Sequence, residues 1–334
     1  MTINAAMQMR STISVAPMMD WTDRHCRYFM RLLSPHARLY TEMVTAAALK
    51  HGDSARLLRF DPSEHPVALQ IGGSDPRLMA EAAKMGAHAG FDEININVGC
   101  PSDRVQSGQF GACLMSSPEL VARCVQRMRA ACEIPITIKT RIGIDDDDNY
   151  EFLRNFIAVN IDAGCTTYIV HARKAILSGL SPKENRSVPP LNYPRVYRLK
   201  KEFPELRIIL NGGVTSVDDC HEHLQHVDGV MIGRQAYHQP WFLTELEREF
   251  GGGGDTRSLT REGAIRKMLP YIERELAGGA ELKHVTRHLL GLFAGQPGAR
   301  AWRRYLSEHA HLAGAGVEVL EQALERLPCP PGSQ

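Results

Sequence analysis

Eight short apolar segments, each followed by a longer stretch, constrain the fold of this 334-residue chain more than any other feature. They are rich in β-branched residues and predict strands at residues 13–16, 39–43, 67–71, 93–98, 136–140, 167–171, 208–211 and 229–232. Intervening windows such as 75–89, 118–131, 150–163 and 193–203 have apolar residues at helical spacing. Eight successive β-then-α units predict an α/β fold with a parallel sheet, and eight is the number that closes a TIM barrel.

An open, doubly wound sheet is the competing architecture. It is expected to carry a GxGxxG turn after its first strand, whereas the turn here, at residues 16–20, contains no glycine. Helix starts are expected at Asp75-Pro76 and Ser117-Pro118, where a capping side chain precedes a proline. The barrel is therefore the preferred interpretation.

The chain changes character after residue 250. Four consecutive glycines lie within residues 251–256 and favour a flexible linker. Beyond them, windows 260–276, 281–292, 299–310 and 317–327 have helical spacing and no strand pattern. We expect a barrel over residues 1–250, a Gly-rich linker over 251–256 and a small all-α helical bundle over 257–334.

The composition bears on the cellular compartment of the protein more than on the partners that it binds. Hydrophobic residues make up 43% and charged residues 23%, as in ordinary globular proteins. The formal net charge of +1 does not by itself point to any class of partner. The eight cysteines form no CxxC pair, which is typical of reduced thiols in a cytosolic protein. Without a signal-peptide pattern or a membrane-length apolar run, we expect a cytoplasmic protein with no membrane association.

The ends of the last two predicted strands indicate a phosphate site. In TIM barrels the loops after strands seven and eight commonly bind phosphate. Asn211, Gly212 and Gly213 follow the seventh strand, and Gly233 and Arg234 follow the eighth. Bare backbone amides and a guanidinium suit a phosphate dianion, although a Gly-Gly pair alone often only makes a tight turn.

Other polar residues end earlier strands at the same face. Lys139 is consistent with a lysine that pairs with a carboxylate, with a Schiff-base lysine, or with a group that stabilises an anion such as reduced flavin. Gln70 and His171 suit hydrogen bonds to a flavin ring or ribityl chain, although His171 is also compatible with a strand-end cap. Cys100 lies in a Gly-Cys-Pro turn after the fourth strand, where a thiol can act as an acid or base.

With these residues assembled, the chain resembles the tRNA-dihydrouridine synthases over nearly its whole length, and especially the bacterial A-type members. Seven segments carry the resemblance in order: VAPMMD at 15–20, QIGG at 70–73, NINVGCPS at 95–102, TIKTR at 137–141, HARKA at 171–175, LNGG at 210–213 and MIGR at 231–234.

The resemblance implies an enzyme that uses FMN, reduced by NADPH, to saturate the C5–C6 bond of uridine in the tRNA D-loop, at positions 20 and 20a. Cys100 would be the general acid that protonates C5 while hydride passes from flavin N5 to C6. The implied FMN contacts are Pro17, Met18, Met19, Gln70, Lys139, His171, Asn211, Gly212, Gly213, Gly233 and Arg234.

The resemblance also implies tRNA contacts by Asn97 at the flipped base, by Lys183 and Arg186 in the loop after the sixth strand, and by Arg300 and Arg303 in the helical bundle. The sequence supports RNA binding independently, since basic residues outnumber acidic ones both between residues 171 and 207 and between 261 and 304. A solvated helix face is the alternative interpretation of Arg300 and Arg303, while Trp302 is expected to pack inward.

Three other functions stay open at this point. A small-molecule FMN enzyme of the dihydroorotate dehydrogenase type would need no basic bundle, a lysine aldolase using Lys139 would need no flavin, and an RNA-binding protein with an inactive barrel would not need Cys100. The acidic run at residues 145–148 lacks other ligands at metal spacing and suits a helix N-terminus, so no metal is assigned. No obligate protein partner is evident, and a monomer is expected.

Overall fold

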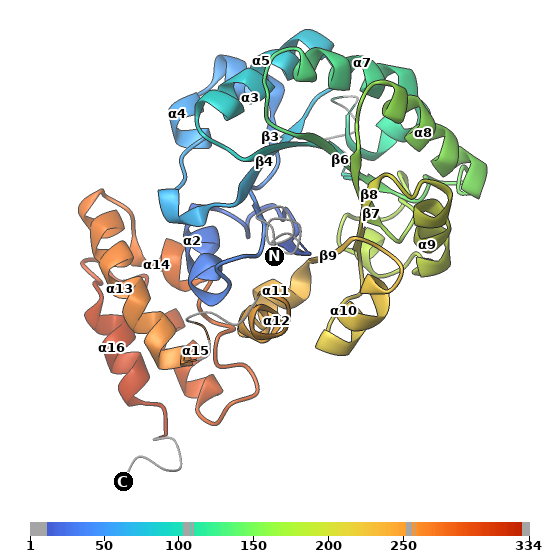
Figure 1. Cartoon of the computed structure of the whole chain (residues 1–334). Coiled ribbons are helices and arrows are strands. Elements are labelled where there is room, and N and C mark those ends of the chain that lie inside the picture. The colour runs from blue at the N-terminus through green and yellow to red at the C-terminus, as the bar shows by residue number, and fades with distance from the viewer. Residues whose placement is uncertain (1–11, 103–107, 109, 252–255, 257, 329–334) are drawn as a thin grey trace, which may run out of the picture. The chain divides into compact units, whose positions relative to one another are not determined.

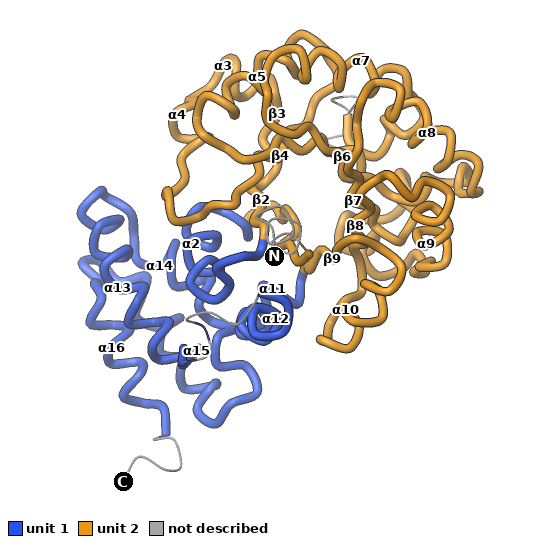
Figure 2. Tube along the Cα trace, in the orientation of Figure 1, with its two compact units in different colours: residues 1–10, 21–37, 234–334 blue, residues 11–20, 38–233 orange. Residues whose placement is uncertain are grey.

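The computed structural model describes residues 12–102, 108, 110–251, 256 and 258–328. The chain divides into two compact units. Unit 2 contains residues 11–20 and 38–233, and unit 1 contains residues 1–10, 21–37 and 234–334 (Figure 2). The predicted domain limits near residues 250 and 257 stay a prediction, and most of the predicted linker, residues 252–255, lies outside the described residues.

Unit 2 is a parallel barrel (Figure 1). Neighbouring strands run in the order β1-β9-β8-β7-β6-β5-β4-β2. Val15 N donates to Arg38 O at 2.9 Å and Arg38 N donates to Ile13 O at 3.1 Å, which joins β1 to the residue before β2 and closes the ring. The strands are β1 (Ile13–Val15), β2 (Leu39–Tyr40), β3 (Val44–Thr45), β4 (Val67–Gly72), β5 (Glu93–Val98), β6 (Ile136–Arg141), β7 (Thr167–His171), β8 (Arg207–Asn211) and β9 (Gly229–Ile232).

The predicted barrel is confirmed, with one strand divided. The expected strand at 39–43 is observed as β2 and β3, both paired with β4. Between them the Thr41 hydroxyl, rather than a backbone carbonyl, accepts from Gln70 N at 3.0 Å. Because a side chain replaces the backbone acceptor, the ladder is interrupted there.

Helices lie outside the ring of strands, as the alternating pattern predicted (Figure 1). Asp75 caps α5 by accepting from Arg77 N and Leu78 N, and Pro76 is its first residue. Pro118 likewise begins α7, but Ser117 makes no capping hydrogen bond, so that part of the prediction is wrong. The helices of unit 2 are α3 (Ala46–His51), α4 (Ser54–Leu57), α5 (Pro76–His88), α7 (Pro118–Arg129), α8 (Tyr150–Asp162), α9 (Tyr193–Glu202) and α10 (Val217–Leu224), with 3-10 turns η1 (Pro62–Glu64), η2 (Gly111–Ser116) and η3 (Glu184–Arg186).

Every regular element in the described part of unit 1 is a helix. Trp302 is fully buried, as expected. Only the first turns of the predicted helix at 281–292 form, and the chain continues as turns after Thr286. The helices are α2 (Arg24–Leu33), α11 (Arg234–His238), α12 (Phe242–Phe250), α13 (Arg261–Ala277), α14 (Leu282–Thr286), α15 (Ala299–His309) and α16 (Glu318–Glu325). Among the described residues, no helix is both long and apolar enough to span a bilayer.

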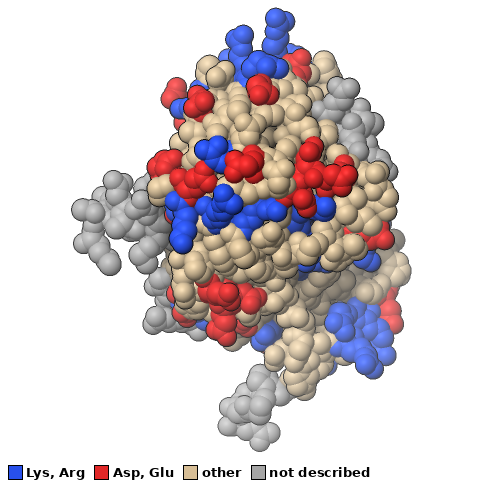
Figure 3. Space-filling model, turned by 90° about the vertical axis from the view of Figure 1, so that its right-hand side faces the viewer, with Lys and Arg blue, Asp and Glu red and all other residues tan. Residues whose placement is uncertain are grey.

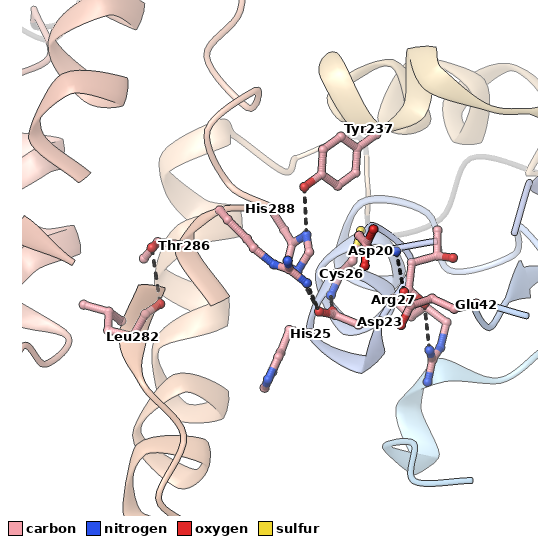
Figure 4. A network of polar contacts seen from close by, with 12 residues as sticks. Asp20, Asp23, His25, Cys26, Arg27, Glu42, Tyr237, Leu282, Thr286 and His288 are labelled. Carbon is pink, nitrogen blue, oxygen red and sulfur yellow. Dashed lines mark hydrogen bonds and ion pairs between the residues drawn. The ribbon is translucent and has the colours of Figure 1, made fainter. Parts of the chain in front are cut away.

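A buried polar network ties α2 to α14 within unit 1 (Figure 4). Asp23 caps α2 by accepting from Cys26 N at 3.0 Å, and it also accepts from Arg287 at 2.6 Å. His288 lies between Asp23 and the hydroxyl of Tyr237, at 3.0 and 3.2 Å. Burial opposes ionisation of Asp23, but His288, with the Cys26 amide and Arg287, holds its pKa well below the usual range. The N-terminus of α2 therefore depends on residues more than 260 positions away.

Candidate active site at the barrel mouth

The carboxyl ends of β4 to β8 gather five of the predicted site residues in unit 2. Register pairs Asn97 with Lys139 across β5 and β6, and His171 with Asn211 across β7 and β8. Lys139 Nζ donates to Asn211 Oδ1 at 2.9 Å, although the two lie on β6 and β8 with β7 between them. Inward-facing side chains thus meet across the mouth, where TIM barrels carry their chemistry.

Lys139 is held in an environment that disfavours its charge. Burial, with a smaller contribution from the Arg141 cation, lowers its pKa from 10.5 to about 7. Its hydrogen-bond acceptor is a neutral amide, and Asn211 in turn donates from Nδ2 to Met231 O at 2.9 Å. A lysine in this state gains most from an anion placed beside it, because that anion restores the stability of the charged form.

Cys100 lies in a turn whose backbone is fixed from several sides. Asn97 Oδ1 accepts from Gly99 N at 3.1 Å and from Cys100 N at 3.0 Å. Arg141 Nε donates to Gly99 O at 3.1 Å. Ala112 N donates to Cys100 O at 2.9 Å. These bonds hold the backbone of residues 99 and 100, and the Cys100 sulfur lies 3.5 Å from the Ser102 hydroxyl.

The remaining described cysteines have different surroundings. Cys26, Cys124, Cys165 and Cys220 are buried, and burial raises the pKa of Cys124, Cys165 and Cys220 to about 12. Cys100 is only half-buried. It also follows a barrel strand at the catalytic face, whereas the half-buried Cys113 and Cys132 bond to nearby backbone carbonyls. Among the described cysteines, Cys100 thus combines partial exposure with a place at the carboxyl ends of the barrel strands.

The turn after β8 requires its two glycines. Gly212 has φ +115° and Gly213 has φ +77°. A Cβ on Gly212 would lie 2.7 Å from His171 Cδ2, and one on Gly213 would lie 2.5 Å from the Tyr193 hydroxyl oxygen. Tyr193 also donates to Gly212 O at 3.0 Å. The turn thus presents backbone directly beside His171, with the surface that a phosphate or ribityl group would need.

The first and last strands contribute apolar and open surface. Met18 packs against the barrel core, whereas Met19 is 54% exposed. Asp20, at φ +65°, donates from its backbone N to Glu42 Oε1 at 2.5 Å, which fixes the end of the segment that begins at Pro17 (Figure 4). A Cβ on Gly233 would meet only Ala16 Cβ, at 4.0 Å, so space remains beside the end of β9.

These features test whether the barrel mouth suits a flavin mononucleotide. Gly213, after β8, is exposed, and open space adjoins Gly233. The described residues give Lys139 no anionic hydrogen-bond partner. The residues present therefore fit a flat, anionic cofactor with a phosphate tail.

Asn97, the predicted contact to the flipped base, is buried at the barrel mouth. The four basic residues predicted to contact RNA are exposed and belong to different units. Lys183 precedes η3 and Arg186 is its last residue, both in unit 2, while Arg300 and Arg303 lie on α15 in unit 1. Arg186 bears on the site electrostatically, since its charge is among those that disfavour the Arg141 cation. The roles of all four in binding RNA stay predictions.

Several of the basic side chains between residues 171 and 207 form ion pairs or hydrogen bonds within unit 2. Lys174 pairs with Asp148 at 3.2 Å and Lys200 with Asp228 at 2.8 Å. Arg195 donates to the carbonyl oxygen of Ile142 at 3.3 Å. Figure 3 accordingly shows Lys and Arg beside Asp and Glu on the face it displays, rather than an uninterrupted basic surface. Counting charges along the sequence overestimated the free positive charge.

Sequence reasoning missed the residues that hold the loop of Lys183 and Arg186. Asn185 is buried between them; its amide accepts from Ile176 N at 2.7 Å and donates to Ile176 O at 2.8 Å. Arg141 Nη1 donates to Asn185 O at 2.9 Å, so one guanidinium braces both this loop and the Cys100 turn. No sequence signal distinguishes Asn185 from an exposed loop asparagine.

The acidic run at 145–148 is also structural in part. Asp145 Oδ1 accepts from Leu177 N at 2.8 Å, and Asp148 is the partner of Lys174. Helix α8 begins at Tyr150 with Asn149 as its cap, so the run precedes the helix and braces the loop after β7. Within the described residues, no cluster of three or more His, Cys, Asp or Glu could hold a metal ion.

Comparisons with known proteins show which family the chain resembles. The dihydrouridine synthase (Dus) family matches the chain over residues 14–327. The chain is 59% identical over 317 residues to the tRNA-dihydrouridine(20/20a) synthase of Vibrio cholerae serotype O1, covering 95% of this chain and 96% of that protein. It is 60% identical over 313 residues to the protein of the same name from Escherichia coli K12, covering 93% and 90%.

A solved structure is similar in fold alone. The old yellow enzyme homologue from Zymomonas mobilis superposes with a TM-score of 0.53 and 12% identity, covering 72% of this chain and 88% of that one. At this identity the similarity supports the barrel architecture and says nothing about the substrate.

Proposed function

Because this chain belongs to the dihydrouridine synthase family, we propose that it reduces the C5–C6 bond of uridine in the D-loop of tRNA, at positions 20 and 20a. The predicted family membership is confirmed by the match over residues 14–327. Relatives at 59% and 60% identity are named for positions 20 and 20a, which supports the same target here. The observation that carries the proposal is this identity over nearly the full chain, together with an accessible Cys100 at the barrel mouth.

We infer that the cofactor is FMN, with NADPH as the reductant. When bound and reduced, the flavin supplies the hydride that is added to C6 of the uracil. Gly212, Gly213 and Gly233, with Arg234, would hold the phosphate, and Pro17, Met18 and Met19 would line the ring. Lys139 favours an adjacent anion because burial has already destabilised its own charge.

Cys100 would supply the proton. Its S–H bond breaks as the new C–H bond forms at C5, and solvent later returns a proton to the thiolate. Asn97 is available to orient the base. Its oxygen accepts from the Cys100 turn, and among the described residues only one N–H of its amide has a partner, Gln70 Oε1 at 2.9 Å. The second N–H can donate to a uracil carbonyl.

Lys183, Arg186, Arg300 and Arg303 would contact tRNA phosphates, which gives affinity without base specificity. The uridine must leave its stack to reach the barrel mouth, because C5 and C6 are inaccessible within one. A tRNA substrate is consistent with the expected cytoplasmic location. The expected monomeric state stays a prediction that light scattering would test.

The proposal is tested by mapping dihydrouridine in tRNA from cells that lack this gene. Dihydrouridine should disappear at positions 20 and 20a, return with the wild-type gene, and not return with Cys100→Ala. Cys113→Ala is the matched control and should restore the modification. Unchanged dihydrouridine in the deletion strain, or purified protein without a flavin spectrum, would overturn the proposal.

A further inference from the structure

A chain of buried polar side chains crosses the barrel interior and ends at the Cys100 turn. Barrel interiors of this type are usually filled by branched apolar side chains. Here the strands instead point a run of polar groups inward, and each is at most 9% exposed. From the start of β5 toward the mouth, the linked residues are Glu93, Thr137, Asn95, Gln70 and Asn97.

Each link is a short hydrogen bond with a defined donor. Asn97 Nδ2 donates to Gln70 Oε1 at 2.9 Å, and Gln70 Nε2 donates to Asn95 Oδ1 at 2.7 Å. Asn95 Nδ2 donates to Thr137 Oγ1 at 2.8 Å, and the Thr137 hydroxyl donates to Glu93 Oε1 at 2.6 Å. Every bond in the chain therefore points toward the Glu93 carboxylate.

The two ends determine this direction. Glu93 accepts from Thr137 and also from Tyr40 at 2.8 Å, and its other oxygen lies 3.5 Å from Arg38. Burial and the neighbouring carboxylate raise the pKa of Tyr40, so its hydroxyl remains a donor. At the other end, the backbone N–H groups of Gly99 and Cys100 can only donate.

Because one end only accepts and the other only donates, all the amides between them must point the same way. A reversed amide at any position would set two donors or two acceptors against each other in a buried site, which is costly. Hydrogen bonds aligned in one direction also strengthen one another.

We propose that Thr137 and Glu93 are positioning residues that act on Cys100 through this chain. They hold the Asn97 amide with its oxygen toward the Gly99 and Cys100 N–H groups, and this orientation keeps the thiol in its reactive position. The inference rests on the proposed role of Cys100 in uridine reduction. Thr137 lies too deep in β6 to touch a substrate, since Lys139 and Arg141 follow it toward the mouth.

Thr137→Val tests the proposal in the flavin-loaded enzyme, because it removes the hydroxyl and leaves a side chain of similar shape. Asn95 Nδ2 then loses its acceptor, so the chain is fixed only at its mouth end, by the Gly99 and Cys100 N–H groups, and the amides between are no longer held from below. Thr137→Ser restores the hydroxyl. Thr140→Val is the matched control. Thr140 is buried on the same strand and alternates to the opposite face, and its hydroxyl donates to Arg141 O at 3.3 Å, its one side-chain bond among the described residues.

Two readouts separate positioning from general damage. Uridine reduction in a tRNA transcript should fall by about tenfold in Thr137→Val, while flavin reduction by NADPH changes by less than about twofold. The pH profile of Cys100 alkylation by iodoacetamide, followed on the Cys100 peptide by mass spectrometry, should shift in Thr137→Val only. Thr137→Ser should match the wild type in both readouts.

The proposal is overturned if Thr137→Val keeps the wild-type alkylation profile, if Thr140→Val produces the same losses, or if Thr137→Ser fails to restore the profile. Should Thr137→Val not fold, Thr137→Ala removes the same hydroxyl without adding a methyl group and must give the same shift. Full activity of Cys100→Ala would instead refute the proposed proton donor, and the alkylation profile would still test the chain itself.

Discussion

Replacing Gly212 by alanine should destabilise unit 2 through two separable effects. The backbone at φ +115° is strained for any residue with a Cβ, at a cost of about 1–3 kcal/mol. The new Cβ would also lie 2.7 Å from His171 Cδ2 and 3.1 Å from His171 Nε2, so the imidazole must move. Forcing a side chain off its rotamer costs about 0.5–1.5 kcal/mol. The expected loss of unfolding free energy is therefore about 1.5–4.5 kcal/mol.

Gly179→Ala isolates the first effect. Gly179 has φ +84°, and a Cβ there would meet nothing within 4 Å, so only backbone strain remains. Urea unfolding of both variants should show Gly212→Ala as the more destabilised. A double-mutant cycle with His171→Ala should recover the difference, because the shortened side chain leaves the methyl group room.

The same variant should affect cofactor binding, because His171 is a proposed flavin ligand. We expect Gly212→Ala to retain less flavin on purification than Gly179→Ala, measured by absorbance relative to protein. Equal stability of the two glycine variants, or no coupling with His171→Ala, would refute the packing argument.

Three further predictions follow from charged residues. In flavin-free protein, Lys139→Met should raise the unfolding free energy at pH 6 more than at pH 10, because the wild-type lysine is charged and buried below its folded pKa of about 7 and neutral above it. A greater gain at pH 10 would contradict this. Asp23→Asn should cost about 1–3 kcal/mol near neutral pH. The folded pKa of Asp23 lies below the unfolded value of 3.8, so the difference from wild type should be full above about pH 4 and shrink as the pH falls further; equal losses at pH 3 and pH 7 would exclude the ionised network. Arg303→Glu should weaken tRNA binding and reduce the salt dependence of the affinity by about one unit of slope. Arg127→Glu, an exposed arginine on α7, is its control, and equal effects of the two would indicate nonspecific attraction.

Several positions show which parts of the candidate site could be predicted from the sequence. The ends of β4 to β8 were predictable, because strand length and alternation place Gln70, Asn97, Lys139, His171 and Asn211 at one face of a closed barrel. Cys100 was a candidate from its Gly-Cys-Pro turn after a strand, and it is half-buried in the structure; its role as the general acid stays a prediction. Ser117 shows the limit: the residue type suited a cap, but its backbone conformation gives no capping bond.

By itself, the sequence determined the barrel, the all-helical character of the C-terminal segment and the family, because periodicity and motif order are local properties repeated along the chain. Only the tertiary structure decided which charges are free and which side chains act together. Lys174 and Lys200 form ion pairs in the fold, and α2 joins the C-terminal helices through Asp23 and His288. The polar chain from Glu93 to Asn97 likewise depends on the register of β4, β5 and β6, and such contacts between distant segments exist only once the barrel closes.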